Sequence, residues 1–270
     1  MKVHHLNCGT MCPRPRRLVN GTGFLGRARM VCHCLVVETK DGLVLIDTGL
    51  ALRDVEAKGG RLGRGFAVAA RPDWNADDTA IRHVMRLGFR PEDVRHVVPT
   101  HLDIDHVSGL VDFPTAKVHV LDREHDAAMK RASFLEKHRY IPEMFAHSPR
   151  WEIHSQKSEK WLGFDAIPVA EDVLLVPMFG HTHGHCAVAV RGDEGRWLLH
   201  CGDAYFFHGE VHAPKRRCPL GLRLFQWLIE IDRAARLGNQ DRLRTLAREH
   251  PEVTVFSAHC PVELDRLAKS

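Results

Sequence analysis

The chain contains a series of short apolar runs, several of which end at a histidine or an aspartate. They are rich in Val, Leu and Ile and are bounded by Gly, Pro or Asp, a composition that favours buried strands. These runs cover residues 29–39, 42–49, 94–100, 116–120, 173–180, 185–192, 196–203 and 253–259. Segments of helical periodicity lie between them, at residues 75–88, 121–139, 221–238 and 239–250. The pattern predicts an α/β fold in which two sheets pack on each other with helices outside.

Length and composition are those of one folded domain. The 270 residues are 44% hydrophobic and 27% charged, and a chain of this length buries a sizeable core. We find no repeat or low-complexity block, and expect a single domain over residues 1–270. The N-terminal stretch "MKVHHLNCGTMCP" lacks the apolar segment of a secretion signal, and no window approaches the length of a membrane span. These features predict a cytoplasmic protein with no membrane partner.

The charge is nearly balanced, at a formal net +4. Lys and Arg are scattered, with local clusters at "RPRR" (14–17) and "KRR" (215–217) that are typical of solvated loops. We therefore expect no nucleic-acid partner. The cysteines are expected to be reduced in the cytoplasm. The pairs Cys8 with Cys12 and Cys32 with Cys34 lack the spacing of a zinc ribbon, which favours structural burial.

The stretch "THLDIDHVSG" (100–109) concentrates metal-ligating side chains where a predicted strand passes into a helical turn. This geometry lets His101 and Asp103 face one point while Asp105 and His106 face another a few ångströms away. It therefore suits two adjacent metal ions. Imidazole and carboxylate groups bind zinc, iron and manganese alike, so the ligand types alone do not choose the metal.

Three other predicted strands end near His181, Asp203 and His259. A rigid strand can hold a ligand at the edge of a sheet while the loop that follows stays open. Packing alone does not explain why four separate strands deliver His or Asp at the same kind of position. The sequence therefore predicts a metal site at the strand ends.

Five motifs in order resemble those of the metallo-β-lactamase fold superfamily. They are "DTG" (47–49), "THLDIDHVSG" (100–109), "GHTHGH" (180–185), "CGDA" (201–204) and "SAHC" (257–260). Their spacing is most similar to that of the N-acyl homoserine lactonase-like branch. The resemblance implies a four-layer αββα fold, with two mixed sheets packed face to face and outer helices.

The resemblance also implies two divalent metal ions. By position, His101, Asp103 and His181 would bind the first ion, Asp105, His106 and His259 the second, and Asp203 would lie between them. We expect zinc, with iron or manganese as alternatives. Asp103 stands where the family usually has histidine. Three ionised aspartates, two divalent cations and a bridging hydroxide have a net charge of zero, whereas a neutral histidine at position 103 would give a net charge of plus one. Such a site polarises water less and is more favourable to iron or manganese.

The implied reaction is attack of the bridging hydroxide on a carbonyl that one metal polarises. Asp105 is the predicted acid that protonates the leaving oxygen, and Tyr205 is a second candidate. The lactonase-like branch has its tyrosine one position later, where this chain has Phe206. One step along a strand reverses the direction of a side chain, which weakens the role of Tyr205. Asp47 and His185 are expected to support the ligands through hydrogen bonds.

Residues 122–165 form an aromatic-rich insertion near the predicted site. Its aromatic side chains belong either to the core or to the substrate mouth; they are Phe134, Tyr140, Phe145 and Trp151. The motif spacing favours a hydrolase of a small-molecule lactone or related ester. The alternatives are a thioesterase or phosphodiesterase of the same fold, an iron-dependent redox protein, and a non-catalytic metal- or ligand-binding protein.

Overall fold

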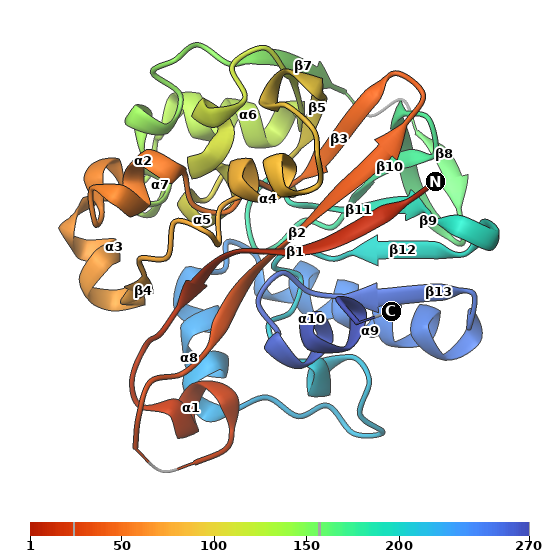
Figure 1. The fold of residues 1–270 in the computed structure, drawn as a ribbon. Helices are drawn as coiled ribbons and strands as arrows, with labels where there is room; N and C mark the ends of the chain where they lie inside the picture. The colour runs from red at the N-terminus through yellow and green to blue at the C-terminus, as the bar shows by residue number, and fades with distance from the viewer. Residues whose placement is uncertain (24, 156–157, 270) are drawn as a thin grey trace.

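The computed structural model describes residues 1–23, 25–155 and 158–269. The described residues form two mixed sheets (Figure 1). The seven-stranded sheet has the order β4 (Pro72–Asp73), β1 (Val3–Met11), β2 (Met30–Thr39), β3 (Gly42–Ile46), β5 (Val94–Val98), β6 (Lys117–Leu121) and β7 (Arg150–His154). The six-stranded sheet has the order β13 (Val253–Phe256), β12 (Trp197–His200), β11 (Cys186–Arg191), β10 (Val173–Pro177), β9 (Phe164–Ala170) and β8 (Glu159–Trp161). Parallel pairs join β3, β5, β6 and β7, and also β12 and β13, whereas the other pairs are antiparallel.

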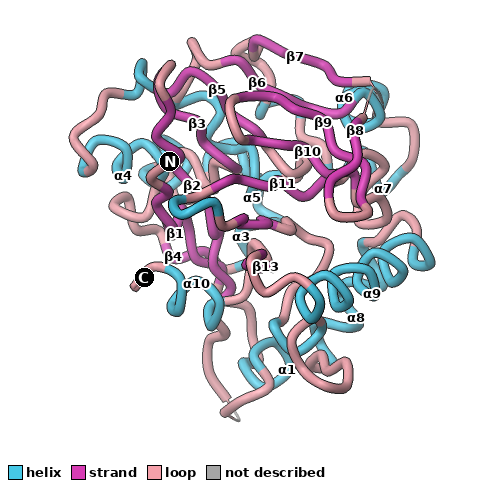
Figure 2. Tube along the Cα trace, turned by 90° about the vertical axis from the view of Figure 1, so that its right-hand side faces the viewer, coloured by secondary structure: helices cyan, strands magenta, loops and turns pink. Residues whose placement is uncertain are grey.

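Helices cover the outer faces of both sheets. The α-helices are α1 (Arg16–Asn20), α2 (Leu52–Glu56), α3 (Gly63–Ala70), α4 (Ala80–Arg86), α5 (Ile104–Val107), α6 (Asp122–Lys130), α7 (Phe134–Arg139), α8 (Leu220–Ile229), α9 (Arg233–Glu249) and α10 (Pro261–Leu267). Short 3₁₀ turns are η1 (Gly60–Leu62), η2 (Pro91–Asp93), η3 (Ser108–Asp112), η4 (Pro142–Met144), η5 (Asp193–Gly195) and η6 (His208–Glu210). In Figure 1, α6 and α9 lie on opposite sides of the strands, and Figure 2 shows α8 and α9 together at the lower right, below the strands. The predicted four-layer αββα fold is confirmed.

The strands bury both faces, as their apolar runs predict. In β3, Val44 and Ile46 join the core between the sheets, whereas Leu43 and Leu45 join the core under α2, α4 and α6. In the second sheet, neighbouring residues of β10 and β11 divide in the same way between the central core and the core under α9. This alternation follows from the two-residue period of a strand. Because the two sheets share the core between them, the ends of their strands are held in fixed positions relative to one another.

Two predicted helix boundaries were wrong. The predicted helix over 121–139 is divided into α6 and α7, because Arg131 adopts a left-handed conformation and Ser133 starts a new helix with a capping box to Glu136. The predicted break between 238 and 239 lies instead before α9, whose N-cap Asp232 accepts a hydrogen bond from the amide of Ala235. None of the described helices is long and apolar enough to cross a bilayer.

Candidate metal centre

Four strands of the two sheets end at one place and deliver the predicted ligands there. His101 follows the end of β5 by three residues, and His181 follows the end of β10 by four. Asp203 and His259 each lie three residues beyond the ends of β12 and β13. Asp103 is the N-cap residue of α5, but its side chain makes no capping hydrogen bond and is directed to the cluster instead. The rigid sheets thus bring together residues that are far apart in the sequence.

The first group of ligand atoms surrounds His181. Its Nε2 atom lies 3.2 Å from Asp103 Oδ2 and 3.3 Å from Asp203 Oδ2. The Nε2 atom of His101 lies 3.3 Å from the same oxygen of Asp103 and 3.9 Å from that of Asp203. His101, His181 and Asp203 have the spacing of a metal-binding group.

The second group surrounds His259. Its Nε2 atom lies 3.0 Å from Asp203 Oδ1, 3.3 Å from His106 Nε2 and 3.5 Å from Asp105 Oδ2. His106 Nε2 lies 3.4 Å from Asp203 Oδ1. His106, Asp203 and His259 also have the spacing of a metal-binding group. Asp203 therefore directs Oδ2 to the first group and Oδ1 to the second.

The electrostatics of the cluster fit a cation. Burial alone raises the pKa of Asp103 and Asp203, but nearby positive groups outweigh it and hold both pKa values well below the usual range. Arg139 and His101 act on Asp103, and His259 and His106 act on Asp203. The buried His101 Nε2 and Asp203 Oδ1 atoms find no hydrogen-bond partner among the described residues. Ionised carboxylates and open imidazole nitrogens are the forms that bind metals.

Asp47 holds His106 in position, as its place at a strand end predicts. Its Oδ2 atom lies 2.8 Å from His106 Nδ1, and its Oδ1 atom accepts a 2.7 Å hydrogen bond from the amide of Thr100. Although burial raises the pKa of Asp47, the adjacent His106 lowers it to about 2. With Nδ1 occupied by the carboxylate, His106 presents Nε2 to the cluster. His185 has the expected supporting role, since its Nε2 accepts a hydrogen bond from the amide of Asp203.

Glu124 was not found from the sequence, although it ties two ligand loops together. It is completely buried in α6. Its Oε1 accepts hydrogen bonds from the amide of Leu102 and the hydroxyl of Tyr140, and its Oε2 accepts one from the amide of Gly184. Leu102 lies between two ligand candidates, and Gly184 belongs to the loop that carries His181. No local motif indicates this role, because the contacts join distant segments.

Arg139 was also not found from the sequence. Its guanidinium is buried beside the cluster, with Nε 3.5 Å from Asp103 Oδ1. It donates to the carbonyl of His181 at 3.0 Å and to the carbonyl of Ile229. Arg139 therefore links the first ligand group to the end of α8.

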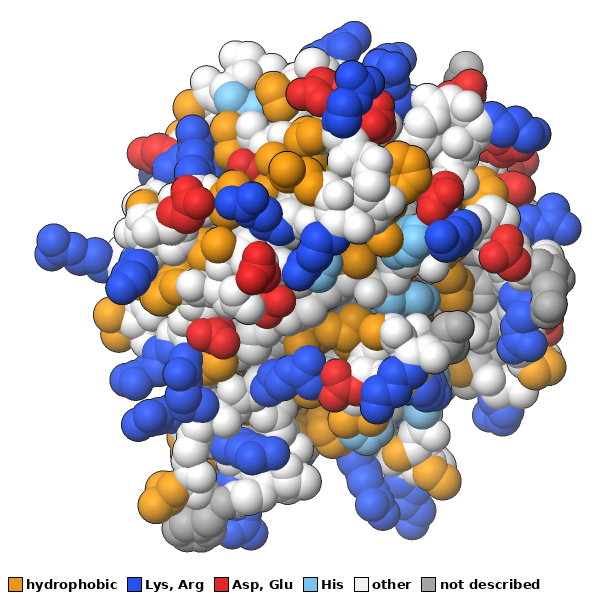
Figure 3. All heavy atoms as spheres, viewed as in Figure 1, with side chains coloured by type: hydrophobic (Ala, Val, Ile, Leu, Met, Phe, Trp, Pro, Cys, Tyr) orange, Lys and Arg blue, Asp and Glu red, His pale blue; other side chains and the backbone are white. Residues whose placement is uncertain are grey.

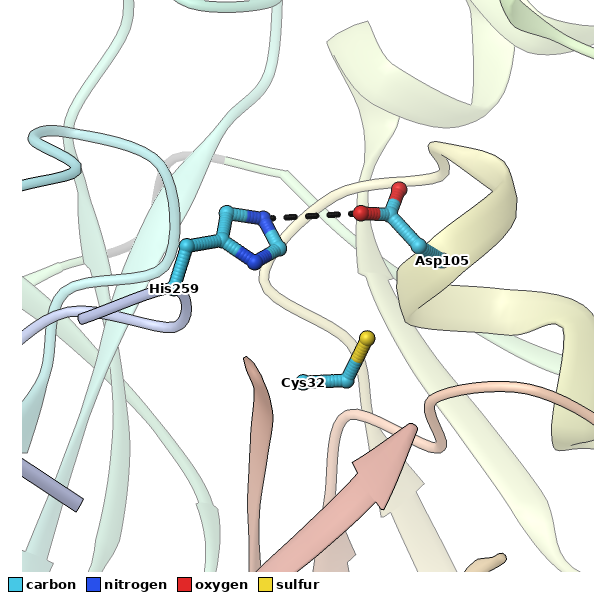
Figure 4. Close-up of side chains that lie close together, drawn as sticks. All are labelled: Cys32, Asp105 and His259. Carbon is cyan, nitrogen blue, oxygen red and sulfur yellow. Dashed lines mark ion pairs between the residues drawn. The ribbon is translucent and has the colours of Figure 1, made fainter. Parts of the chain in front are cut away.

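Cys32 is buried, as expected, and it also lies at the second group. Its thiol, Asp105 and His259 together have the spacing of a metal-binding group, and the thiol points towards the space between the other two (Figure 4). Cys32 is almost completely buried, and burial raises the pKa of its thiol well above the usual value. The other three cysteines of the predicted pairs, Cys8, Cys12 and Cys34, are also buried and free.

The structure does not bring Tyr205 to the cluster. Its side chain is completely buried in the core under α9, and its hydroxyl donates a 2.9 Å hydrogen bond to Glu263. Phe206, the next residue, stacks on the ring of His259. Tyr205 and Phe206 lie in the loop after β12 rather than on a strand, so strand alternation does not apply, but their side chains point to different surroundings and the Tyr205 hydroxyl has no access to the ligand groups.

A cavity of about 590 Å³ opens at the cluster. Asp103, Asp105, Asp203 and His259 lie at its base. Its apolar wall includes Met11, Met30, Phe66, Ile104, Phe206 and Phe225.

The 122–165 insertion contributes α7 to the cavity, through Leu135, His138 and Arg139. The four aromatic residues considered from the sequence do not line it. Tyr140 is buried against Glu124, Phe145 and Trp151 pack against the outer core of the first sheet, and Phe134 is exposed.

Comparison with known proteins gives the family. The model of the metallo-beta-lactamase superfamily matches residues 27–259. A probable metallo-hydrolase of Mycobacterium tuberculosis is 42% identical over 274 aligned positions, which cover 100% of this chain and 83% of that protein. An N-acyl homoserine lactonase of Bacillus cereus is 27% identical over 199 positions, which cover 72% of each chain.

Solved structures show the same fold. An N-acyl homoserine lactone hydrolase with its product N-hexanoyl-L-homoserine bound at the catalytic metal centre has a TM-score of 0.73 and 19% identity, with 98% of this chain and 95% of that chain covered. A dizinc quorum-quenching lactonase has a TM-score of 0.64 and 16% identity, with coverage of 97% and 90%. The family match, the fold and the ligand groups agree, and the chain belongs to the metallo-β-lactamase superfamily.

Proposed function

We propose that this protein is a dinuclear metal-dependent hydrolase of lactones or related carboxylic esters that carry an apolar acyl chain. Zinc is the proposed metal. The first ion would be bound by His101, Asp103 and His181, the second by Asp105, His106 and His259, and Asp203 would bridge them. The observation that carries the proposal is the division of Asp203, whose Oδ2 faces His181 and whose Oδ1 faces His259. A carboxylate with one oxygen in each group suits two ions a few ångströms apart.

The cavity supports the substrate class. Its lining is mainly apolar, and its carboxylates are those of the two ligand groups, an arrangement that suits an apolar chain with one polar group directed to the metals. Two lactonases among the structural relatives support the same class: one has its acyl-homoserine product bound at the catalytic metal centre, and the other is in complex with such a product.

Metal ions bound here would supply a water activated at neutral pH and a Lewis acid for the carbonyl. The residues of the chain provide the rest. Phe206 covers His259 and keeps that side of the cluster apolar. Asp105 lines the cavity and its side chain is 15% exposed, so it can reach a substrate and pass a proton to the leaving oxygen.

The test is hydrolysis of a panel of acyl lactones and aryl esters by protein that has been stripped with a chelator and reloaded with zinc. The proposal predicts turnover only after reloading, with a preference for longer acyl chains. Asp105→Asn is expected to lower kcat about 100-fold or more even when excess zinc keeps both sites filled, because a proton donor contributes on the order of 10²–10⁴ in rate. The panel includes thioesters and phosphodiesters, and turnover of these alone would replace the ester assignment with the corresponding alternative.

Metal identity separates the remaining alternatives. Iron in the purified protein, together with oxygen or peroxide consumption, would assign a redox function instead. Zinc binding without turnover of any substrate class would favour a binding protein.

A further inference from the structure

Four helices that come from distant parts of the chain line the cavity. α1 contributes Val19, α3 contributes Phe66, α7 contributes Leu135, and α8 contributes Leu222 and Phe225. α1 packs directly against α8. These helices therefore share one face of the molecule, around the entrance to the metal centre.

The helix α8 is apolar on more than its cavity side. Leu222 is buried against the cavity wall, whereas Leu220, Leu224, Trp227 and Leu228 are between 55% and 63% exposed. These four residues follow the spacing i, i+4, i+7 and i+8 and form a stripe along the outside of the helix. Leu18 of α1, Val68 of α3 and Phe134 of α7 are further exposed apolar side chains on the same helices. A helix with apolar residues on both sides indicates that a partner covers the outer side.

The same face is mainly basic, although α7 also carries the buried Glu136, and Arg29 and Arg216 are paired with Asp265 and Asp241 of other helices. Segments 13–29, 63–71 and 215–229 supply three of the four helices and contain Lys and Arg but neither Asp nor Glu. The chain as a whole is nearly balanced, with 38 basic and 34 acidic residues, so the fold concentrates positive charge here. Figure 3 shows Lys and Arg side chains gathered at the lower left, over α1 and α3. Of the two basic clusters that suggested only solvated loops, 14–17 leads into α1 and 215–217 precedes α8, and these two helices contact each other.

From this combination we propose that the α1, α3, α7 and α8 face docks on an anionic lipid surface, with the cavity entrance towards the bilayer. Exposed Leu and Trp interspersed with Lys and Arg suit the boundary between acyl chains and headgroups. The Lys and Arg side chains attract anionic headgroups, and each of these side chains adds to the affinity when it lies near the surface. The docking is peripheral and involves no membrane-spanning helix. It does not depend on the proposed hydrolysis.

Charge complementarity favours a lipid surface over a second copy of the chain. A two-fold dimer through this face would place one mainly basic surface opposite another, and like charges across an interface are unfavourable. An anionic bilayer can bind the Lys and Arg side chains through its headgroups and the apolar stripe through its acyl chains.

The experiment measures cosedimentation of the full-length protein with vesicles of phosphatidylcholine alone and of phosphatidylcholine with phosphatidylglycerol. The proposal predicts binding to the anionic vesicles that weakens as salt is raised, and little binding to neutral ones. Analytical ultracentrifugation without lipid measures the oligomeric state in parallel.

Two variants separate the apolar and basic contributions. Leu224→Ser/Trp227→Ser/Leu228→Ser removes the stripe and is expected to abolish measurable binding. Lys215→Gln/Arg217→Gln/Arg223→Gln is expected to weaken binding about 100-fold, since each base near the surface contributes roughly fivefold. These residues are exposed, so the variants should fold; circular dichroism and zinc content check this.

Matched controls carry comparable changes on other elements. Met85→Ser on α4 replaces an apolar side chain that is 51% exposed, and Arg95→Gln on β5 removes an exposed base. Both should bind anionic vesicles like the unchanged protein. The proposal is overturned if the protein ignores anionic vesicles, if the two α8 variants bind as well as the controls, or if the stripe variant converts a stable dimer into a monomer.

Discussion

The Nε atom of Arg139 lies 3.5 Å from the Oδ1 atom of Asp103, while the Oδ2 atom of Asp103 faces His101 and His181. Where the family usually has a neutral histidine, this chain therefore has an anion with a buried cation beside it. On the proposed ligand assignment, Arg139 offsets the extra negative charge that Asp103 brings. The Asp103–Arg139 pair as a whole carries no net charge, as the neutral histidine ligand that it replaces would.

This relationship predicts non-additive effects in a double-variant cycle. Asp103→His leaves the Arg139 cation unpaired beside the metals and is expected to lower zinc affinity about tenfold or more. Adding Arg139→Met to that variant should recover most of the loss. Competition with a chromophoric chelator measures the affinities. Equal zinc binding by Asp103→His and the double variant would show that the two residues are not coupled through charge.

Asp47 offers a second prediction, because it contacts a proposed ligand but does not itself face the cluster. Asp47→Asn tolerates the left-handed backbone at this position, where φ is 54°. It should lower zinc affinity about 10- to 100-fold by loosening His106, with little change in the fold. Isothermal titration of the stripped protein measures the effect. Asp172→Asn, at another left-handed position but on the surface, is the control and should bind zinc normally.

Glu124 is predicted to stabilise both ligand loops. In Glu124→Gln one of the two backbone amides loses its acceptor, which should lower the free energy of unfolding by about 1–3 kcal/mol. Tyr140→Phe removes only the hydroxyl that also donates to Glu124 and should cost about 1 kcal/mol. Urea unfolding measures both. A Glu124→Gln protein as stable as the unchanged protein would contradict the role assigned to this carboxylate.

Three histidines on neighbouring strands predict a loss of stability in acid. His119 lies 2.8 Å from His96 and 2.9 Å from His154, measured between ring nitrogens. Burial and the two neighbours lower the pKa of His119 to about 3, and burial lowers the pKa values of the others. In the unfolded state these histidines bind protons near pH 6.5, whereas in the folded state they bind protons only at lower pH. The contribution of the neutral histidines to stability is therefore complete above pH 6.5 and is lost as the pH falls towards 3.

Thermal unfolding between pH 8 and pH 4 tests this sign. His119→Gln is expected to lower the melting temperature by roughly 2–4 °C at pH 8 and to reduce the decline in acid. His250→Gln, at the end of α9, should leave the decline unchanged. A decline of the same size in His119→Gln would mean that other groups cause the acid sensitivity.

The strand ends could be predicted from the sequence because each depends on a local pattern. The apolar runs before His101 and His259 mark strands, and strands fix where the next residues lie. The boundary before α9 could also have been found, since Asp232 precedes a helical pattern as an N-cap.

Glu124 and Arg139 could not be identified in this way. Their helices lie within an insertion, and their partners are residues of distant loops. The position of Cys32 beside His259 likewise depends on how the two sheets meet. The basic face has the same origin, because segments that look scattered in the sequence become neighbours only in the fold.

The most direct test of the central claim is the number of metal ions per chain. Elemental analysis after zinc loading and dialysis is predicted to give about two zinc ions for the unchanged protein and about one for His181→Ala or His106→Ala, each of which removes a ligand from one group. A single zinc ion in the unchanged protein, or none, would contradict the account of a centre shared through Asp203.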